Sequence, residues 1–266
     1  MNFVILLFSA IIGLVTGSFL NVVILRGAAN EKLSGRSHCP FCKQKLSIKE
    51  LIPVASFFAQ KGQCLRCKEK ISWQYPLVEI LTAIVFTITV WIFTKNIFWP
   101  DFYNSISLIL FLIGLSAAIV ITVADLRFKI IPNGPLLVLL GLGIYLTAQK
   151  WYYYGVKSAG ADFAASFTLA LFLGSIWFFS KGKMMGFGDP KLIFATSLVL
   201  GFPTSITAFI FTFWLGGVVS LGLLALRTYG LKSQIPLGPF IIAGSLLAYF
   251  FSDYFLNFTG FNQFFF

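Results

Sequence analysis

The chain has 266 residues, of which 58% are hydrophobic and only 11% are charged, and its formal net charge is +11. Soluble globular domains carry about 25% charged residues. This composition, with a mean hydropathy of +0.88, therefore excludes an ordinary soluble domain and predicts an integral membrane protein. The positive charge follows the membrane topology described below, so we expect no nucleic-acid partner.

Hydrophobic stretches that suit the about 30 Å hydrocarbon core of a bilayer recur along the whole chain. We predict membrane-spanning helices at 3–25, 76–94, 105–124, 134–149, 162–180, 203–226 and 236–256. An eighth stretch, 190–201, covers only about 18 Å at about 1.5 Å per residue, so it is tilted, re-entrant or begins earlier. The predicted fold is an all-α polytopic membrane protein with eight transmembrane helices.

The distribution of Lys and Arg predicts the orientation, because cytoplasmic loops carry an excess of basic residues. With eight spans and an outside N-terminus, 17 of the 20 basic residues fall on the cytoplasmic side, where anionic membrane lipids attract them. A seven-span arrangement would move Arg227 and Lys232 outside. The first segment lacks a basic start and a clear cleavage site, so we interpret it as a retained span and not a signal peptide.

The segment 26–75 is the one sizeable polar stretch, and it holds all four cysteines in two CxxC pairs: Cys39, Cys42, Cys64 and Cys67. Thiolates at this spacing can close a tetrahedral Zn²⁺ site. The alternatives are disulfides, which a cytoplasmic location disfavours, or free thiols. His38 is either a surface neighbour of this site or a ligand. We therefore expect a first helix (1–25), a small cytoplasmic zinc-ribbon-like insert (26–75) and a seven-helix membrane domain (76–266), without an evident internal repeat.

Two aspartates stand where hydrophobic helices meet the basic side of the membrane, Asp125 before Ile131-Pro132-Asn133 and Asp189 within Gly186-Phe187-Gly188-Asp189-Pro190-Lys191. A carboxylate at this depth is costly unless it faces protein or water, so it indicates a functional site. Two such carboxylates side by side share one proton. One can then take a proton from water while the other protonates a carbonyl oxygen, which is aspartyl protease chemistry.

Simpler roles remain open for each residue. Asp189 would be the N-cap of a helix whose first residue is Pro190, and Asp125 would pair with Arg127 or Lys129 or cap the following turn. The single histidine lies in the insert, which excludes an intramembrane HExxH site or Ser-His pair in the helical bundle.

Two further segments are candidates for supporting the site. We expect Glu79, about one turn into the second span, to pair with Arg26; the alternative is that it orients a substrate. The run from Pro236 through Gly238 to Pro239 opens the last span. It is either only a helix start or an interrupted entry whose exposed backbone binds an extended peptide.

Ordered motifs run through nearly the whole chain: Gly17-Ser18-Phe19-Leu20-Asn21, the paired CxxC motifs, Tyr75-Pro76-Leu77-Val78-Glu79, Asp125-Leu126-Arg127, Ile131-Pro132-Asn133, Gly186-Phe187-Gly188-Asp189 and Pro236-Leu237-Gly238-Pro239-Phe240. In this order they resemble the bacterial prepilin peptidases, the leader peptidase and N-methyltransferase enzymes of type IV pilus, type II secretion and competence systems.

The resemblance implies a GxGD-type intramembrane aspartyl protease of the bacterial inner membrane, with Asp125 and Asp189 as its catalytic residues. Gly186, Gly188, Lys191, Pro236, Gly238, Pro239 and Glu79 would bind substrate or support the site. The implied substrates are prepilins or pseudopilins, cut after glycine at the cytoplasmic face. The implied second activity is methylation of the new N-terminus by S-adenosylmethionine, which the retained cysteines favour.

Two other classes of protein compete with this interpretation. A transporter would use Asp125 and Asp189 as proton or cation sites. A membrane-tethered zinc-ribbon scaffold would keep the aspartates for structure alone.

Overall fold

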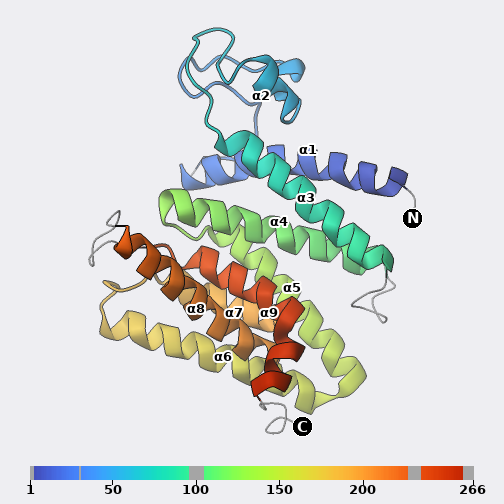
Figure 1. Cartoon of the computed structure of the whole chain (residues 1–266), viewed down its shortest axis with the longest axis vertical. Helices are drawn as coiled ribbons and strands as arrows, with labels where there is room; N and C mark the ends of the chain where they lie inside the picture. The colour runs from blue at the N-terminus through green and yellow to red at the C-terminus, as the bar shows by residue number, and fades with distance from the viewer. Residues whose placement is uncertain (1–2, 30, 96–104, 227–234, 260–266) are drawn as a thin grey trace. The chain divides into compact units, whose positions relative to one another are not determined.

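A computed structural model describes residues 3–29, 31–95, 105–226 and 235–259. The regular elements of this described part are all helices, and eight of them have 13 residues or more (Figure 1). Their bounds are α1 Phe3–Ala28, α3 Gln74–Lys95, α4 Ser105–Phe128, α5 Asn133–Tyr154, α6 Val156–Phe179, α7 Gly188–Leu200, α8 Thr204–Ala225 and α9 Gly238–Thr259. The all-α prediction is therefore confirmed.

Five of the described helices are long and apolar enough to cross a membrane: α1, α3, α4, α6 and α8. The chain is therefore a multi-pass membrane protein. The short stretch near 190 begins two residues earlier than expected, because α7 starts at Gly188. Its 13 residues cover only about 20 Å at 1.5 Å per residue. The count of eight spans stays a prediction.

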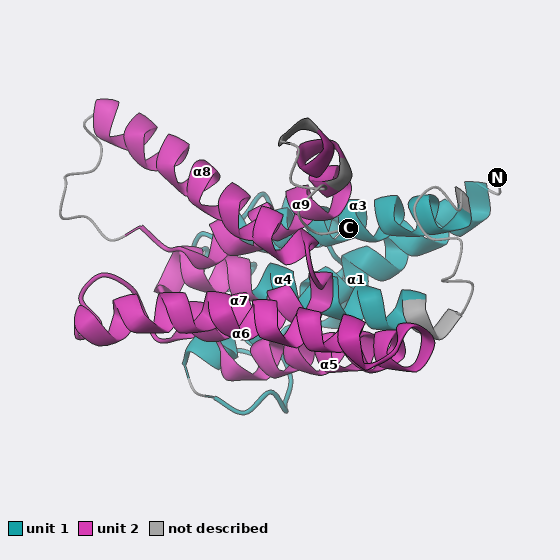
Figure 2. Ribbon diagram, turned by 90° about the horizontal axis from the view of Figure 1, so that it is seen from below, with its two compact units in different colours: residues 1–120 teal, residues 121–266 magenta. Residues whose placement is uncertain are grey.

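The chain divides into two compact units, residues 1–120 and 121–266, which are coloured separately in Figure 2. In the first unit α1 packs along α3. Gly13 and Gly17 of α1 make this packing close, because a Cβ atom on Gly13 would lie 2.6 Å from the Cα atom of Ala83, and one on Gly17 would lie 2.7 Å from that of Glu79. Glycines four residues apart allow membrane helices to approach backbone to backbone.

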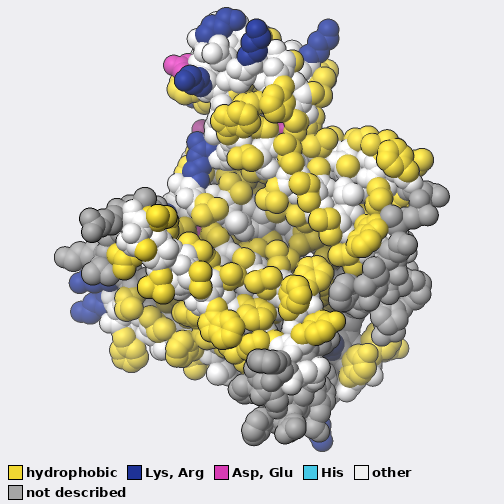
Figure 3. Space-filling view, viewed as in Figure 1, with side chains coloured by type: hydrophobic (Ala, Val, Ile, Leu, Met, Phe, Trp, Pro, Cys, Tyr) yellow, Lys and Arg dark blue, Asp and Glu magenta, His cyan; other side chains and the backbone are white. Residues whose placement is uncertain are grey.

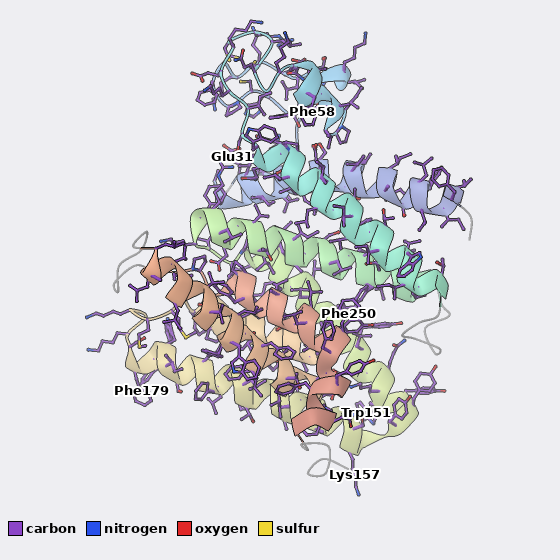
Figure 4. The ribbon with its side chains drawn as sticks, in the orientation of Figure 1. Glu31, Phe58, Trp151, Lys157, Phe179 and Phe250 are labelled. Carbon is purple, nitrogen blue, oxygen red and sulfur yellow. The ribbon has the colours of Figure 1, made fainter. Side chains whose placement is uncertain are left out.

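The insert between α1 and α3 contains two short helices, η1 (Ile48–Leu51) and α2 (Ala55–Ala59). Among its described residues 31–75, only Cys39, Phe57 and Cys64 are buried. Phe57 packs against Trp73, with ring centroids 4.9 Å apart, and its neighbour Phe58, also on α2, is exposed (Figure 4). A core this small does not stabilise a fold of this length without a cross-link or a metal.

The insert also contains a local repeat that the sequence analysis did not find. The isolated bridge between His38 and Lys45 recurs between Gln63 and Lys70, an offset of 25 residues. The matching sequences are CPFCKQKLS and CLRCKEKIS. The expectation of no internal repeat is therefore wrong for the insert, where two copies of one turn lie within the same small fold.

In the second unit the short helix α7 packs against α5, α6, α8 and α9. Eight of its 13 residues are buried, among them Leu192, Ile193 and Ala195. A Cβ atom on Gly143 of α5 would lie 2.7 Å from the Cβ atom of Leu198 on α7, so these two helices are in close contact. The four surrounding helices thus enclose the segment that carries Asp189.

An ion pair joins the ends of several helices of this unit. Asp162 of α6 is buried, lies 2.9 Å from the Lys150 ammonium of α5, and accepts a 2.6 Å hydrogen bond from the Phe202 N–H after α7. Figure 4 shows the nearby α5–α6 connection by its labelled residues Trp151 and Lys157, with Phe179 at the other end of α6. A buried carboxylate with a cation and an N–H donor fixes the end of α7 that lies away from Asp189.

Surface chemistry differs between the insert and the helices. In Figure 3, Lys and Arg side chains gather on the insert, whereas hydrophobic side chains cover the long helices. Large apolar side chains of α1, such as Phe3, Phe8 and Val15, are more than half exposed. An apolar exterior of this kind suits contact with lipid chains and not with water.

Candidate active site and metal centre

Asp125 lies in the last turn of α4, where the helix ends before Lys129 in a left-handed conformation with φ of 55°. The carboxylate is buried, and its Oδ2 atom accepts a 2.8 Å hydrogen bond from the backbone N–H of Gly238 at the start of α9. A Cβ atom on Gly238 would lie 2.6 Å from that oxygen. Glycine is therefore required for α9 to approach the Asp125 carboxylate this closely.

Asp189 lies in the first turn of α7 and is also buried. The prediction that it caps this helix is wrong, because the helix begins at Gly188 and its N-cap position is Phe187. Its Oδ2 atom accepts a 3.2 Å hydrogen bond from the N–H of Gly186, which precedes the helix. The side chain is thus held by the glycine turn and not by the N–H groups that a cap would satisfy.

The second unit brings the two aspartates together, because the charge of Asp125 acts on the carboxyl group of Asp189. Gly188 makes this approach possible. A Cβ atom at this position would lie 2.9 Å from the Cβ atom of Ile131, in the segment that follows α4. By contrast, a Cβ atom on Gly186 would have its closest neighbour at 3.8 Å, so Gly186 has room for a side chain. The pair sits in a protein-lined, largely water-excluded position, where charges interact strongly.

The other predicted residues of this unit lie at or next to the starts of α7 and α9. Lys191 is in the first turn of α7, with its ammonium 4.6 Å from the centroid of the Phe187 ring, a cation–π contact. Pro236 precedes α9, and Pro239 is in its first turn beside Gly238. Neither proline has an N–H to donate, so Gly238 supplies the N–H that reaches Asp125.

Glu79 lies in the first unit, buried on α3. The predicted pairing with Arg26 is wrong. The Arg26 guanidinium donates to carbonyls of its own loop, including those of Leu33 and Ser34 at 2.9 and 2.8 Å. Glu79 instead accepts a 2.7 Å hydrogen bond from the N–H of Val54. Val54 has φ of 60°, which is unfavourable for a β-branched residue, so the carboxylate helps to hold a strained turn of the insert next to α3.

The four cysteines of the insert form one cluster, with their Sγ atoms all within 4.8 Å of one another. The Sγ atoms of Cys39 and Cys67 are 3.8 Å apart. Four sulfurs bound tetrahedrally at about 2.3 Å from a zinc ion would also be separated by about 3.8 Å. The donor set and its dimensions therefore fit Zn²⁺, and His38 lies outside the cluster.

The backbone around the cysteines is arranged as two matching knuckles. The N–H groups of Lys43 and Lys68 donate to the carbonyls of Cys39 and Cys64, at 2.9 and 3.0 Å. Both lysines adopt positive φ, 57° and 60°, which closes each turn tightly. Hydrogen bonds from the backbone N–H groups of Cys67 and Arg66 lower the pKa of the Cys64 thiol to about 7. The pKa of the Cys67 thiol in the same cluster is raised to about 11, so metal binding has to displace its proton.

One polar contact was missed by the sequence analysis. Asn21 of α1 is buried, and its amide donates to the carbonyl of Tyr75 at 3.1 Å and accepts from the Gln74 amide at 3.2 Å. The sequence does contain a sign of this contact, because Asn21 is a single amide inside a hydrophobic helix. Such residues often join membrane helices by hydrogen bonds.

The fold is that of a multi-pass helical membrane protein. It combines a site with two buried carboxylates and an insert with a four-cysteine cluster that fits a metal ion. The chain belongs to the type IV leader peptidase family. The model of that family matches residues 112–221, and the model of the bacterial peptidase A24 N-terminal domain matches residues 11–93. The first match contains both aspartates, and the second contains all four cysteines.

Curated relatives agree over almost the whole chain. A prepilin leader peptidase/N-methyltransferase of Bacillus subtilis is 33% identical over 252 residues, which cover 93% of this chain and 95% of the relative. Proteins with the same name from Legionella pneumophila and Pseudomonas aeruginosa are 26% and 28% identical, covering 84% and 95% of this chain and 74% and 93% of their own lengths. No solved structure matches the chain.

Proposed function

We propose that this protein is an intramembrane aspartyl endopeptidase that removes the leader peptide of type IV prepilins or pseudopilins. The cut follows a glycine at the cytoplasmic face, and the new N-terminus is then methylated. The observation that supports the peptidase most directly is that two buried carboxylates, Asp125 and Asp189, lie in one unit and each accept a hydrogen bond from a glycine N–H. The names of the relatives support the substrate class and the second activity.

In the peptidase reaction the two aspartates share one proton. The ionised carboxylate takes a proton from a water molecule, whose oxygen attacks the scissile carbonyl carbon, while the other aspartate gives its proton to the carbonyl oxygen. When the tetrahedral intermediate collapses, the C–N bond breaks and the new amine takes the proton that the first aspartate had accepted. A hydroxyl of the intermediate returns its proton to the second aspartate, so the pair again holds one proton. The leader leaves with a free carboxyl group, and the mature pilin keeps a free N-terminal amine.

Backbone N–H groups orient both carboxylates for this exchange. Gly238 donates to Oδ2 of Asp125 and Gly186 donates to Oδ2 of Asp189. We assign proton transfer to the Oδ1 atom of each residue. Orientation by fixed donors limits the rearrangement needed during the reaction, which is a main source of enzymatic rate enhancement.

The methyl donor for the second activity would be S-adenosylmethionine, which supplies a methyl group from its sulfonium sulfur. The described part of the chain has no strand, glycine-rich turn and helix of the kind that cradles nucleotides. We therefore derive no step of methyl transfer through this cofactor.

The four-cysteine cluster supports a structural Zn²⁺. Four thiolates fill a tetrahedral site and leave no open position for catalysis. The ion would hold Cys39, Cys42, Cys64 and Cys67 together in an insert that buries little else.

The loop charges support a location in the bacterial inner membrane with eight spans and an outside N-terminus. The insert and the ends of α4 and α7 that carry the aspartates would then be cytoplasmic. Of the 20 basic residues, 10 lie between 26 and 75, where they would face the anionic lipid surface and a cytoplasmic substrate. We keep 1–25, 26–75 and 76–266 as the functional domains, with the peptidase in the last.

The test is co-expression with a prepilin that has a basic leader and a Gly-Phe junction, followed by intact mass measurement of the pilin. The wild-type chain should remove the leader and add about 14 Da, and the Asp189→Asn chain should do neither. An intact prepilin beside the wild-type chain would contradict the peptidase. A shortened pilin without the added mass would contradict only the methyltransferase.

A further inference from the structure

Three aromatic side chains form a cluster where the insert joins α3. The rings of Phe57 and Phe58 on α2 lie with their centroids 4.9 and 6.3 Å from that of Trp73, the residue before α3. Phe57 is buried, whereas Phe58 and Trp73 are more than half exposed. Phe58 and Trp73 therefore form an aromatic surface that the packing of the insert leaves uncovered.

Trp73 also begins an exposed apolar stripe along α3. Large apolar side chains follow one another at intervals of three or four residues: Trp73, Leu77, Leu81, Ile84, Ile88 and Trp91. Such intervals place side chains on one face of a helix. The opposite face packs against α1, where Gly13 and Gly17 approach Ala83 and Glu79. Since α3 is long and apolar enough to cross a membrane, the exposed stripe is the side that suits contact with lipid.

The tryptophans at the two ends of the stripe indicate the depth of the aromatic surface. Trp73 and Trp91 are 18 residues apart, which is about 27 Å along a helix. This length matches the about 30 Å hydrocarbon core of a bilayer, and tryptophan is enriched at both boundaries of that core. The spacing places Trp73 at one boundary, and Phe58, which packs beside it, at the same level.

Further contacts hold α2 at this level and place a cation next to it. The N–H of Val54, the residue before α2, donates to Glu79 of α3 at 2.7 Å. At the other end of α2, the N–H of Lys61 donates to the carbonyl of Phe58 at 3.0 Å. The Lys61 side chain is exposed, and its long stem allows the ammonium group to reach lipid phosphates beside an apolar surface.

We propose that the insert docks on the membrane through α2. Phe58 and Trp73 enter the headgroup layer, and Lys61 binds the phosphate of an anionic phospholipid. An apolar aromatic surface with a basic edge is typical of attachment in the plane of the membrane interface. The docking involves neither aspartate, and it holds the four-cysteine cluster at the membrane surface.

Photocrosslinking tests the contact with lipid. Benzoylphenylalanine replaces Phe58 in one chain and Phe41 in another, and both chains, checked for equal zinc content, are irradiated in vesicles of equal parts phosphatidylcholine and phosphatidylglycerol. Phe41 is the matched control, because it is also exposed and lies between the first two cysteines of the same insert. By intact mass, position 58 should form phospholipid adducts with a yield at least about 10-fold higher, since burial of a phenylalanine ring favours the contact by that factor or more.

Two outcomes of this experiment would overturn the docking. Equal lipid adducts at both positions would show that the insert has no preferred lipid-facing side. Adducts from position 58 to another segment of the protein or to a second copy, in place of lipid, would show that protein covers the aromatic surface.

The identity of the captured lipid tests the role of Lys61. At position 58, phosphatidylglycerol adducts should exceed phosphatidylcholine adducts about fivefold, because one basic side chain near the surface favours anionic lipid by about that factor. Lys61→Gln should reduce this excess by at least about half, whereas Lys68→Gln, in the second cysteine knuckle, should keep it. Equal capture of the two lipids by wild type, or equal effects of the two variants, would overturn the assignment to Lys61 and anionic headgroups.

A second measurement needs no change at Phe58. The tryptophan fluorescence of wild type minus that of Trp73→Phe is recorded in vesicles whose lipid chains carry bromine, a quencher, either near the headgroup or near the chain end. The shallow bromine should quench this difference signal most, because Trp73 lies at the boundary of the hydrocarbon core. Absence of quenching would place Trp73 in water, and stronger quenching by the deep bromine would place it inside the core; each result would overturn the proposal.

Discussion

At the scale of single residues, the site depends on two glycines, which have no side chain to keep neighbouring segments apart. Gly238 allows α9 to reach Asp125, and Gly188 allows α7 to pack against Ile131, in both cases at distances that a Cβ atom would not permit. Neither position has a positive φ. These glycines are therefore needed for close approach and not for an unusual backbone conformation. These close approaches fix the backbone next to each aspartate.

This interpretation predicts different results for the two glycines that precede Asp189. Gly188→Ala places a methyl group 2.9 Å from the Cβ atom of Ile131 and must move α7, whereas Gly186→Ala meets only ordinary contacts. A displacement of about 1 Å can lower a rate about 100-fold, so we expect that loss in kcat/KM for Gly188→Ala. Gly186→Ala should stay within about threefold of wild type. Equal losses in peptide cleavage assays would contradict the packing role of Gly188.

At the scale of elements, the structure joins parts that the sequence leaves separate. α1 and α3 are linked by backbone contact at Gly13 and Gly17 and by the hydrogen bonds of Asn21. The insert between them is tied to α3 by the bond from the Val54 N–H to Glu79. This anchoring orients the insert on the helix pair from which it extends.

The α1–α3 contact predicts a position-dependent loss of stability. A leucine at Gly13 would overlap the backbone of Ala83, whereas the Cβ position of Gly27 on the same helix is open. Overpacking of this kind costs about 1–3 kcal/mol. Gly13→Leu should therefore lower the thermal unfolding midpoint in detergent, followed by tryptophan fluorescence, while Gly27→Leu should leave it close to wild type. An unchanged midpoint for Gly13→Leu would show that the contact does not contribute to stability.

The cysteine cluster predicts one zinc ion per chain. Because the insert buries so few residues, its folding should depend on the zinc-binding free energy, which is about 10–16 kcal/mol for structural zinc sites at pH 7. Cys42→Ser should lose the zinc and make the insert sensitive to trypsin. His38→Ala should keep both zinc and resistance, because His38 lies outside the cluster. Metal analysis of the purified chains measures this, and loss of zinc in His38→Ala would make the histidine a ligand.

Zinc should also leave as the pH falls. The ligands must be thiolates, so protonation competes with the metal, and affinity should decrease steadily on the acidic side of neutrality. A zinc content that does not change between neutral and acidic pH would be inconsistent with an all-thiolate site.

The sequence was sufficient to predict the helices and the cysteine cluster because both are local patterns. Hydrophobic stretches fix the helix positions within a few residues, and CxxC spacing brings thiolates together in tight turns. The contacts of individual charged residues were predicted less well. Glu79 was assigned to Arg26 because opposite charges attract, but Arg26 donates to loop carbonyls and Glu79 accepts from a backbone N–H. Such backbone partners leave no mark in a sequence.

At the scale of the whole molecule, the net charge of +11 and the apolar composition have one physical explanation. Of the 20 basic residues, 17 belong to segments on one predicted side of the bilayer, and most apolar residues belong to the long helices. The short helix α7 is the exception, because its 13 residues are enclosed by four other helices of its unit. Such enclosure allows a carboxylate to stay within a membrane protein, since it faces protein and not lipid.

The central claim is that Asp125 and Asp189 act as one unit, and single-turnover cleavage of a prepilin peptide tests it most directly. The purified wild-type chain is compared with Asp125→Asn, Asp189→Asn and the double variant, each checked for zinc content and thermal unfolding. Each single variant should lose at least about 10³-fold in rate, and the double variant should be no slower than either one, because groups that act together are not additive. A folded single variant that keeps more than about a tenth of the wild-type rate would remove that aspartate from the catalytic pair and contradict the account.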